Sequence, residues 1–469
     1  MSLASSVSTH RRVGPSAFTS LVRTRRARER SILVTSTART SSGDTAAFAS
    51  NDVVGSALVE DAIEAASAAA PAPQASRLSF WLVTAATALA LAASGTPSPL
   101  YVDYQAKWGF SATTITLIYG IYAGGVLLAL LTMGGLSDRI GRRPVMLGSI
   151  GVLAASMVVF VFADNVGWLY AARAIQGVAT GVFTGAAGAA LSELHFRRDH
   201  RVASLVNSTA TASGIAFGAV LTGVLAQWAP ARLVTPYLVV AGLSVVVLVG
   251  IAIWVPETVA NRQSLRSSLI RIQRLSLPAG IRREFAIGGL SVTAAWSVGG
   301  LYLALGGTIA KELLHVNNHL VAGLVILAVQ GVGGVSQLIW NLTRPAATIR
   351  SSALVGSAAL IVGLVLASIG LATSTSVTFF AGAIATGVGF GLAFMAGTRR
   401  VTQAAPDAQR GEVLAAYFVI AYIAISVPAI IAGLVSTHLG ITETFYWFAG
   451  ITSLIAAVVF VSSAREHNP

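Results

Sequence analysis

The 469-residue chain has no cysteine, and only 10% of its residues are charged. The absence of cysteine excludes a disulfide framework, a thiolate metal site and a cysteine nucleophile. The shortage of charge excludes an ordinary water-soluble fold, because soluble proteins carry roughly 25% charged residues. Hydrophobic residues make up 55% of the chain instead, so lipid must be part of its solvent.

Long runs without charge fill the chain from Leu78 to Ala464. A run of about 20 apolar residues crosses a bilayer as a helix, in which every backbone polar group is satisfied internally. The run 351–398 is too long for one crossing, and the polar turn 373–376 divides it into two. The sequence therefore predicts an all-α integral membrane protein with twelve transmembrane helices.

The basic residues are distributed unevenly between the two sides that these helices define. One side carries 19 Arg and Lys residues, between Arg77 and Arg465, whereas the other carries Lys107, Arg232 and Lys311. By the positive-inside rule, both termini are cytoplasmic and the protein spans the cell membrane several times. The basic residues are spread over short loops and form no single patch, so lipid is the expected partner and nucleic acid is not.

Six predicted helices lie on each side of a long central loop, which indicates two pseudo-symmetric halves. The predicted parts are a disordered cytoplasmic tail (1–77), a first half (78–256), the cytoplasmic loop (257–284), a second half (285–464) and a cytoplasmic end (465–469). Helices four and ten correspond in the two halves, and both carry glycines that allow close packing: Gly177, Gly181, Gly185 and Gly188 in one, Gly382, Gly387, Gly389 and Gly391 in the other.

The segment between helices two and three, 134–144, carries the most specific signal. Its glycines permit a tight turn, and a single carboxylate lies among arginines. Such a carboxylate can pair with an arginine or lie against the positive end of another helix. A loop with an incidental acid is the simpler alternative. The predicted conformational motif comprises Gly134, Asp138, Arg139, Gly141, Arg142 and Arg143.

This segment resembles the cytoplasmic loop motif of the major facilitator superfamily of secondary transporters, at every key position. The resemblance covers residues 78–464 and includes 169–177 in helix four and the Pro-Glu-Thr end of helix six, 256–258. It implies two six-helix halves and alternating access. It also implies that Asp138 contacts the opposite half near the start of helix eleven, where Glu412 is a candidate partner for Arg142 or Arg143.

Two departures qualify the resemblance. In the second-half copy of the loop, Arg344 stands where the aspartate would be repeated. In helix five, Gly214 and Gly218 are followed by Ala219, so the Gly-Pro pair typical of drug/proton antiporters is missing. The second departure weakens the antiporter assignment and leaves the superfamily assignment intact.

Arg173 is the one charge well inside a predicted span, where an arginine costs ~2.5–3.5 kcal/mol. It either gives polarity to a cavity wall or ties helix four to its neighbours. No acid lies inside a span, so a proton carrier must come from the helix ends. The coupling candidates are Arg173, Gln176, Asp103, Glu193 and Glu412.

Polar and aromatic residues in otherwise apolar helices are candidates for the substrate cavity, although packing or interfacial anchoring also explains each one. These are Tyr119, Tyr122, Asn207, Trp296, Gln330, Gln337, Tyr417 and Tyr422. Two prolines, Pro97 and Pro99, predict a bend at the end of helix one. His315 and His319 have a spacing that suits a metal, but they lie in a short loop, and we expect no metal site and no cofactor.

The predicted function is secondary active transport of small organic compounds by alternating access, as efflux of drugs or metabolites. Solute uptake, by proton symport or facilitation, is the alternative. A polytopic membrane enzyme is the alternative from another class, and it is disfavoured because no nucleophile has a visible base. We expect a monomer that binds a small-molecule substrate, with protons as the candidate coupling ion.

Overall fold

The computed structural model describes residues 76–197, 199–259, 275–313, 318–344, 346–406 and 409–466. Twelve helices in these ranges are long and apolar enough to cross a membrane, which confirms the predicted number. Nearly all of the predicted tail 1–77 and the middle of the loop 257–284 lie outside the described residues.

The first half contains six membrane crossings. The first crossing is interrupted at Pro97 and Pro99, where a bend was predicted: α3 ends at Gly95 and a short 3₁₀ turn, Ser98–Leu100, leads into α4. The helices are α3 (Arg77–Gly95), α4 (Tyr101–Trp108), α5 (Ala112–Met133), α6 (Leu136–Ile140), α7 (Arg142–Val161), α8 (Val166–Leu194), α9 (His200–Trp228) and α10 (Thr235–Trp254).

The second half also contains six crossings, and the polar turn at 373–376 divides two of them as predicted. In the second crossing of this half, a π-helical turn, Leu327–Gly331, separates α12 from α13 and contains Gln330. The helices are α11 (Arg282–Thr308), α12 (His319–Ile326), α13 (Val332–Thr343), α14 (Ile349–Ala372), α15 (Ser376–Ala404), α16 (Arg410–Leu439) and α17 (Ile441–Ala464).

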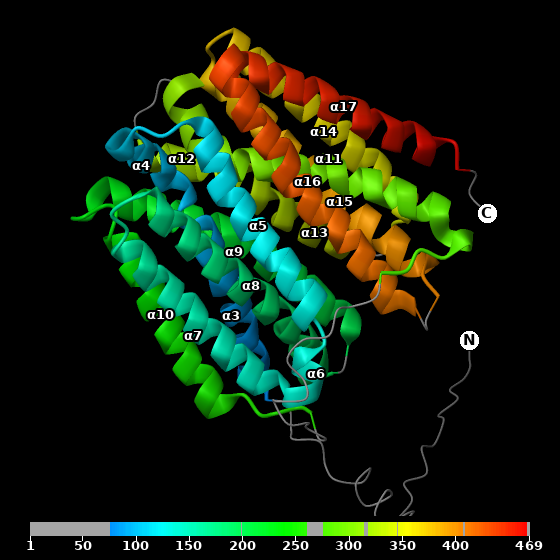
Figure 1. The fold of residues 1–469 in the computed structure, drawn as a ribbon. Helices are drawn as coiled ribbons and strands as arrows, with labels where there is room; N and C mark the ends of the chain where they lie inside the picture. The colour runs from blue at the N-terminus through cyan, green and yellow to red at the C-terminus, as the bar shows by residue number, and fades with distance from the viewer. Residues whose placement is uncertain are drawn as a thin grey trace, which may run out of the picture. The chain divides into compact units, whose positions relative to one another are not determined.

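The two halves repeat one packing pattern, which Figure 1 shows in blue to green and in green to red. In the first half α7 packs on α8 and α10, and in the second half α14 packs on α15 and α17. The repeat extends to single bonds. Arg143, near the start of α7, donates to the carbonyl of Ala252 near the end of α10. Arg350, near the start of α14, donates to the carbonyl of Ala464 at the end of α17, over 2.9 Å.

The halves meet along two pairs of helices. Helix α5 packs against α16, and the two lie side by side in Figure 1, while α9 packs against α12 and α13. Thr113, at the start of α5, donates to the Gly433 carbonyl over 3.1 Å. This contact lies at the end of the bundle away from Asp138, which we call the opposite end. The end that contains Asp138 is called the Asp138 end.

Glycine permits the closest helix contact inside the first half. A Cβ atom at Gly218 of α9 would lie 1.9 Å from the carbonyl oxygen of Ala92 in α3, and one at Gly214 would lie 2.2 Å from that of Ala88. Water cannot drive apolar helices together inside lipid, so close backbone packing is a main source of helix association. Gly214 and Gly218 therefore allow α3 to pack closely against α9. In the sequence the same two glycines marked a departure from the antiporter pattern.

We predict that Gly218→Ala lowers stability by about 1–3 kcal/mol, because the added methyl group forces α3 and α9 apart. Gly242→Ala is the matched control, since a Cβ at Gly242 would meet no atom within 4 Å. Thermal unfolding of the purified protein in detergent measures both. Equal melting temperatures for the two variants would contradict the packing argument.

Candidate functional site

The segment between α5 and α7 folds as a tight turn around Gly141. Gly134 follows the end of α5, α6 carries Asp138 and Arg139, and α7 begins at Arg142. Gly141 has a φ of 111°, a backbone conformation that side chains disfavour, so this position requires glycine. The turn brings Asp138 and Arg142 to one side of the segment, where they form an ion pair.

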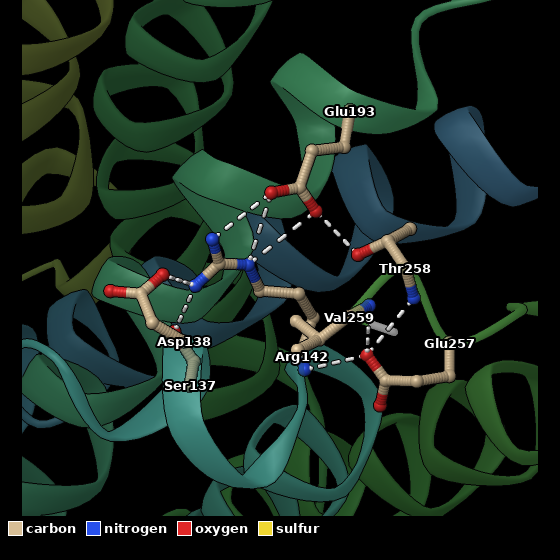
Figure 2. Close-up of polar contacts among 7 residues, drawn as sticks. All are labelled: Ser137, Asp138, Arg142, Glu193, Glu257, Thr258 and Val259. Atoms are coloured by element: carbon tan, nitrogen blue, oxygen red, sulfur yellow. Dashed lines mark hydrogen bonds and ion pairs between the residues drawn. The ribbon is translucent and has the colours of Figure 1, made fainter. Parts of the chain in front are cut away.

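The guanidinium of Arg142 joins three segments of the first half (Figure 2). Besides Asp138, it contacts Glu193 near the end of α8, with 3.0 Å between Nη2 and Oε1, and it donates to the Ser137 hydroxyl over 2.7 Å. Thr258, which follows α10, donates to the other oxygen of Glu193. The Arg142 side chain is only 11% exposed, so these bonds replace the water that it loses.

Glu257 satisfies the N-terminus of α7. Its carboxylate accepts from the backbone N–H of Arg142 over 2.9 Å and of Arg143 over 3.2 Å. The same carboxylate accepts from the N–H groups of Thr258 and Val259. The first N–H groups of a helix have no partner within the helix, and the helix dipole favours an anion there. The Pro-Glu-Thr segment that follows α10 therefore binds the start of α7.

The expected contact of Arg142 or Arg143 with Glu412 is not the one observed. Arg142 pairs with Asp138 and Glu193, both in its own half, and Arg143 bonds the Ala252 carbonyl. Glu412 lies at the start of α16 in the other half. Sequence position could not decide between the two acids, because both lie at the same end of the bundle.

Arg173 is fully buried and is tied to helix one. It donates to the Tyr101 hydroxyl over 2.7 Å, the Ser94 carbonyl over 3.0 Å and the Gln176 side chain over 2.6 Å. Its guanidinium also lies 5.2 Å from the centre of the Tyr122 ring, a distance that allows a cation–π contact. One nitrogen, Nη2, has no hydrogen-bond partner among the described residues. A buried positive charge therefore lies within the first half, and no carboxylate in the described part of the chain pairs with it.

A cavity of about 1040 Å³ lies at the Asp138 end, between α9 of the first half and α11, α13 and α15 of the second. Of the eight predicted cavity residues, Gln337 lines it. The lining that the sequence analysis missed includes Ser204, Ser208, Asn341, Phe394, Thr398 and Arg399. Arg399 and Arg400 were missed because the charges seemed to end the helix at 398, whereas α15 continues to Ala404.

An aromatic cluster of the second half leads inward from this cavity. Phe394 lines the cavity, and its ring centre lies 5.3 Å from that of Trp296, which lies 5.3 Å from that of Tyr422. These three side chains pack on the core that contains Tyr119 and Tyr122 of the first half. Trp296 Nε1 is buried without a hydrogen-bond partner among the described residues, so it is an unused donor next to the cavity-lining Phe394.

Three other predicted cavity residues are not part of this lining. Tyr417 is buried, and its hydroxyl lies 3.3 Å from that of Thr398. Gln330 is buried in the π-helical turn of helix eight. Asn207 is half-buried and faces Gly188 of α8.

An arginine also joins three segments of the second half, at the mouth of the cavity. Arg400 of α15 contacts Glu284 of α11 and Glu466 after α17, each over 2.6 Å. The hydrogen bonds from Arg400 hold the pKa of the Glu466 carboxyl below its usual value. Arg400 therefore joins α15, the start of α11 and the segment after α17.

Comparison with known proteins identifies this architecture. The profile of the Major Facilitator Superfamily matches residues 83–356, more than half of the chain. The chain belongs to the major facilitator superfamily.

Relatives within the superfamily include the multidrug transporter MdfA of Escherichia coli O157:H7, which is 28% identical over 382 residues, 78% of this chain and 88% of MdfA. The inner membrane transport protein YajR of Escherichia coli K12 is 35% identical over 97 residues, 20% of this chain and 21% of YajR. Solved structures share the fold at low identity. A POT family transporter superposes with a TM-score of 0.67 at 12% identity, covering 84% of this chain and 98% of that one. The human organic anion transporter MFSD10 gives 0.59 at 18% identity, covering 82% and 100%.

We predict that Asp138→Asn shifts this superfamily member toward the state seen here, in which the cavity lies at the Asp138 end. The Asp138 side chain is 60% exposed in this state, and Arg142 keeps its bonds to Glu193 and Ser137 without it, so the loss of the carboxylate costs little here. The resemblance assigns it a contact with the other half in the alternate state, and the substitution removes that contact. Because the chain has no cysteine, Ser204→Cys in the cavity and Thr113→Cys at the opposite end can report the shift.

Maleimide labelling at constant pH should become faster at position 204 and slower at position 113, on the order of fivefold. Asp164→Asn, an exposed acid at the opposite end, is the control and should change neither rate. Unchanged rates in Asp138→Asn would refute this role for the carboxylate.

Proposed function

We propose that this chain exports neutral or weakly acidic organic compounds by alternating access and acts as a transporter rather than as an enzyme. We further propose that the protein is a monomer in the cell membrane and that both of its termini are cytoplasmic. In that orientation the Asp138 end faces the cytoplasm. The excess of arginine and lysine at that end supports this orientation. In this orientation the cavity takes compounds from the cytoplasm.

The substrate class is inferred from the charged residues that line the cavity. Three arginines line it, Arg350, Arg399 and Arg400, against the two carboxylates Glu284 and Glu466. Both carboxylates pair with Arg400 at the mouth, whereas Arg399 donates to Asn341 beside Gln337. Among the described lining residues guanidinium groups outnumber carboxylates, and this excess of positive charge disfavours a cation.

The inner end of the site favours flat, apolar compounds with a hydrogen-bond acceptor. Phe394, Trp296 and Tyr422 offer ring faces, and Trp296 Nε1 offers a donor. Farther in, Arg173 lies against Tyr122 and adds positive potential. Pockets of this kind obtain affinity from aromatic contact and orientation from a few polar groups.

The name of the relative MdfA, a multidrug transporter, supports efflux over uptake. Uptake by the same cavity is the alternative, and the direction of transport distinguishes the two. Transport into inside-out vesicles, with and without an imposed pH gradient, tests both direction and proton linkage. Accumulation that requires the cytoplasmic face outside supports export, and accumulation only in right-side-out vesicles would overturn it.

We predict that Arg399→Gln removes the discrimination by charge. Cationic compounds should gain transport relative to anionic ones of equal size, by on the order of tenfold, because a charge facing the substrate is removed. Arg344→Gln is the matched control, since Arg344 lies over the Trp340 ring and is not part of the cavity lining. Identical charge preference in wild type and Arg399→Gln would reject the electrostatic argument.

We predict that Trp296→Phe weakens transport of compounds with a hydrogen-bond acceptor more than that of hydrocarbons of similar shape. The substitution keeps an aromatic ring but removes the Nε1 donor, a loss worth about 1 kcal/mol, or roughly fivefold in apparent affinity. Trp447→Phe on the exposed face of α17 is the control. Equal losses for both kinds of compound would show that the indole only packs.

A further inference from the structure

A pair of titratable side chains joins the two halves at the opposite end. Asp103 lies on α4 of the first half, and His319 begins α12 of the second half. His319 Nε2 is 2.6 Å from Asp103 Oδ2, and the two side chains are 15% and 13% exposed. The pair is thus largely removed from water, and it spans the boundary that alternating access must open.

The surroundings of His319 determine which protonation state fits. Gln227 Oε1, on α9, accepts from the backbone N–H of His319 over 3.2 Å. A backbone N–H requires an acceptor, so this side-chain atom of Gln227 is the amide oxygen and not the nitrogen. The same oxygen lies 3.4 Å from Nδ1 of the His319 ring.

Both ring nitrogens of His319 therefore face oxygen acceptors, Gln227 on one side and Asp103 on the other. A neutral imidazole has a hydrogen on only one nitrogen, whereas an imidazolium donates from both. The imidazolium is also the form that pairs with the Asp103 carboxylate as a charge. The arrangement fits a proton bound to His319.

Two other charged side chains lie near this pair, and neither replaces His319 at the Asp103 carboxylate. Arg232, between α9 and α10, approaches the second carboxylate oxygen of Asp103 to 3.7 Å, but its side chain is 59% exposed. Lys107 lies one turn farther along α4 and contacts the Trp108 ring. Arg232 approaches the other carboxylate oxygen, so it leaves the pairing of Oδ2 with His319 intact.

We propose that Asp103, His319 and Gln227 form a proton-binding site that exists only while the opposite end is closed. When the halves part at this end, α12 must leave α4 and α9, and His319 loses both acceptors. The proton is then bound more tightly in the closed state than in the open one. By linkage, acidity closes the opposite end, to the same extent that closure tightens proton binding.

This site adds a pH-sensitive step to the transport cycle. With the proposed orientation, on which this consequence rests, the opposite end faces the outside. After the substrate leaves, an external proton stabilises closure and returns the cavity to the cytoplasmic side. Outside acidity therefore favours the closed state to which an exporter must return, while the proton itself need not cross the membrane. Glu193, another candidate for proton coupling, lies in the Arg142 cluster at the other end.

The test measures the distance between the halves as pH changes, without any substrate. Spin labels at Phe162→Cys and Val377→Cys, which are 68% and 80% exposed on different halves, report the opposite end in lipid nanodiscs. Double electron–electron resonance from pH 5 to pH 8 gives the populations of short and long distances. In wild type the ratio of closed to open should fall by about tenfold across this range.

His319→Gln should abolish most of this dependence, and Asp103→Asn, a second variant at the site, should do the same. His438→Gln is the matched control. His438 is an exposed imidazole in the last turn of α16, also at the opposite end, and its loss should leave the pH dependence of the distances unchanged. A pH response that survives both substitutions, or none in wild type, would overturn the proposal. Because no transport is measured, the result stands apart from whether the protein exports or imports.

Discussion

The ion pairs of Arg142 hold together the cytoplasm-facing end proposed for the first half. One guanidinium joins the turn before α7, the end of α8 and, through Glu193 and Thr258, the segment after α10. Helices in lipid gain little from apolar contact alone, since the surrounding chains are equally apolar. A largely buried charge with several bonded partners supplies the specificity that apolar contact lacks, because removing the Arg142 guanidinium would take the cation from both acids at once.

The second half solves the same problem with different residues. Arg400 lies on α15, the counterpart of α8, and its two glutamates come from α11 and from the end of α17. The charges are exchanged, so the arginine stands on the helix that carries the acid in the first half. The pseudo-symmetry therefore resides in helix packing and in the need to join three segments, not in the identity of the residues.

The two ends of the molecule differ in whether their polar bonds lie within one half or cross between the two halves. At the Asp138 end the strong ion pairs lie within each half, so a cavity can separate α9 from α13 and α15 without breaking them. At the opposite end the bonds cross between the halves, at Thr113 and Gly433 and at Asp103 and His319. A transition to the alternate state must break the second set and form a new set around Asp138, so the relative strength of these few bonds sets the balance.

The sequence by itself determined the number of helices, the division at 373–376 and the interruption at Pro97 and Pro99, because these depend on composition along the chain. The superfamily followed from the resemblance carried by the segment 134–144. The sequence also placed Asp138 and Arg142 within reach of each other, since they are four residues apart. The tertiary structure decided that Glu193 and not Glu412 pairs with Arg142, that Arg399 and Asn341 enter the cavity, and that Asp103 meets His319. Helices that are apolar on all sides carry no pattern that says which face meets which neighbour. Only the packing of twelve such helices fixes those partners.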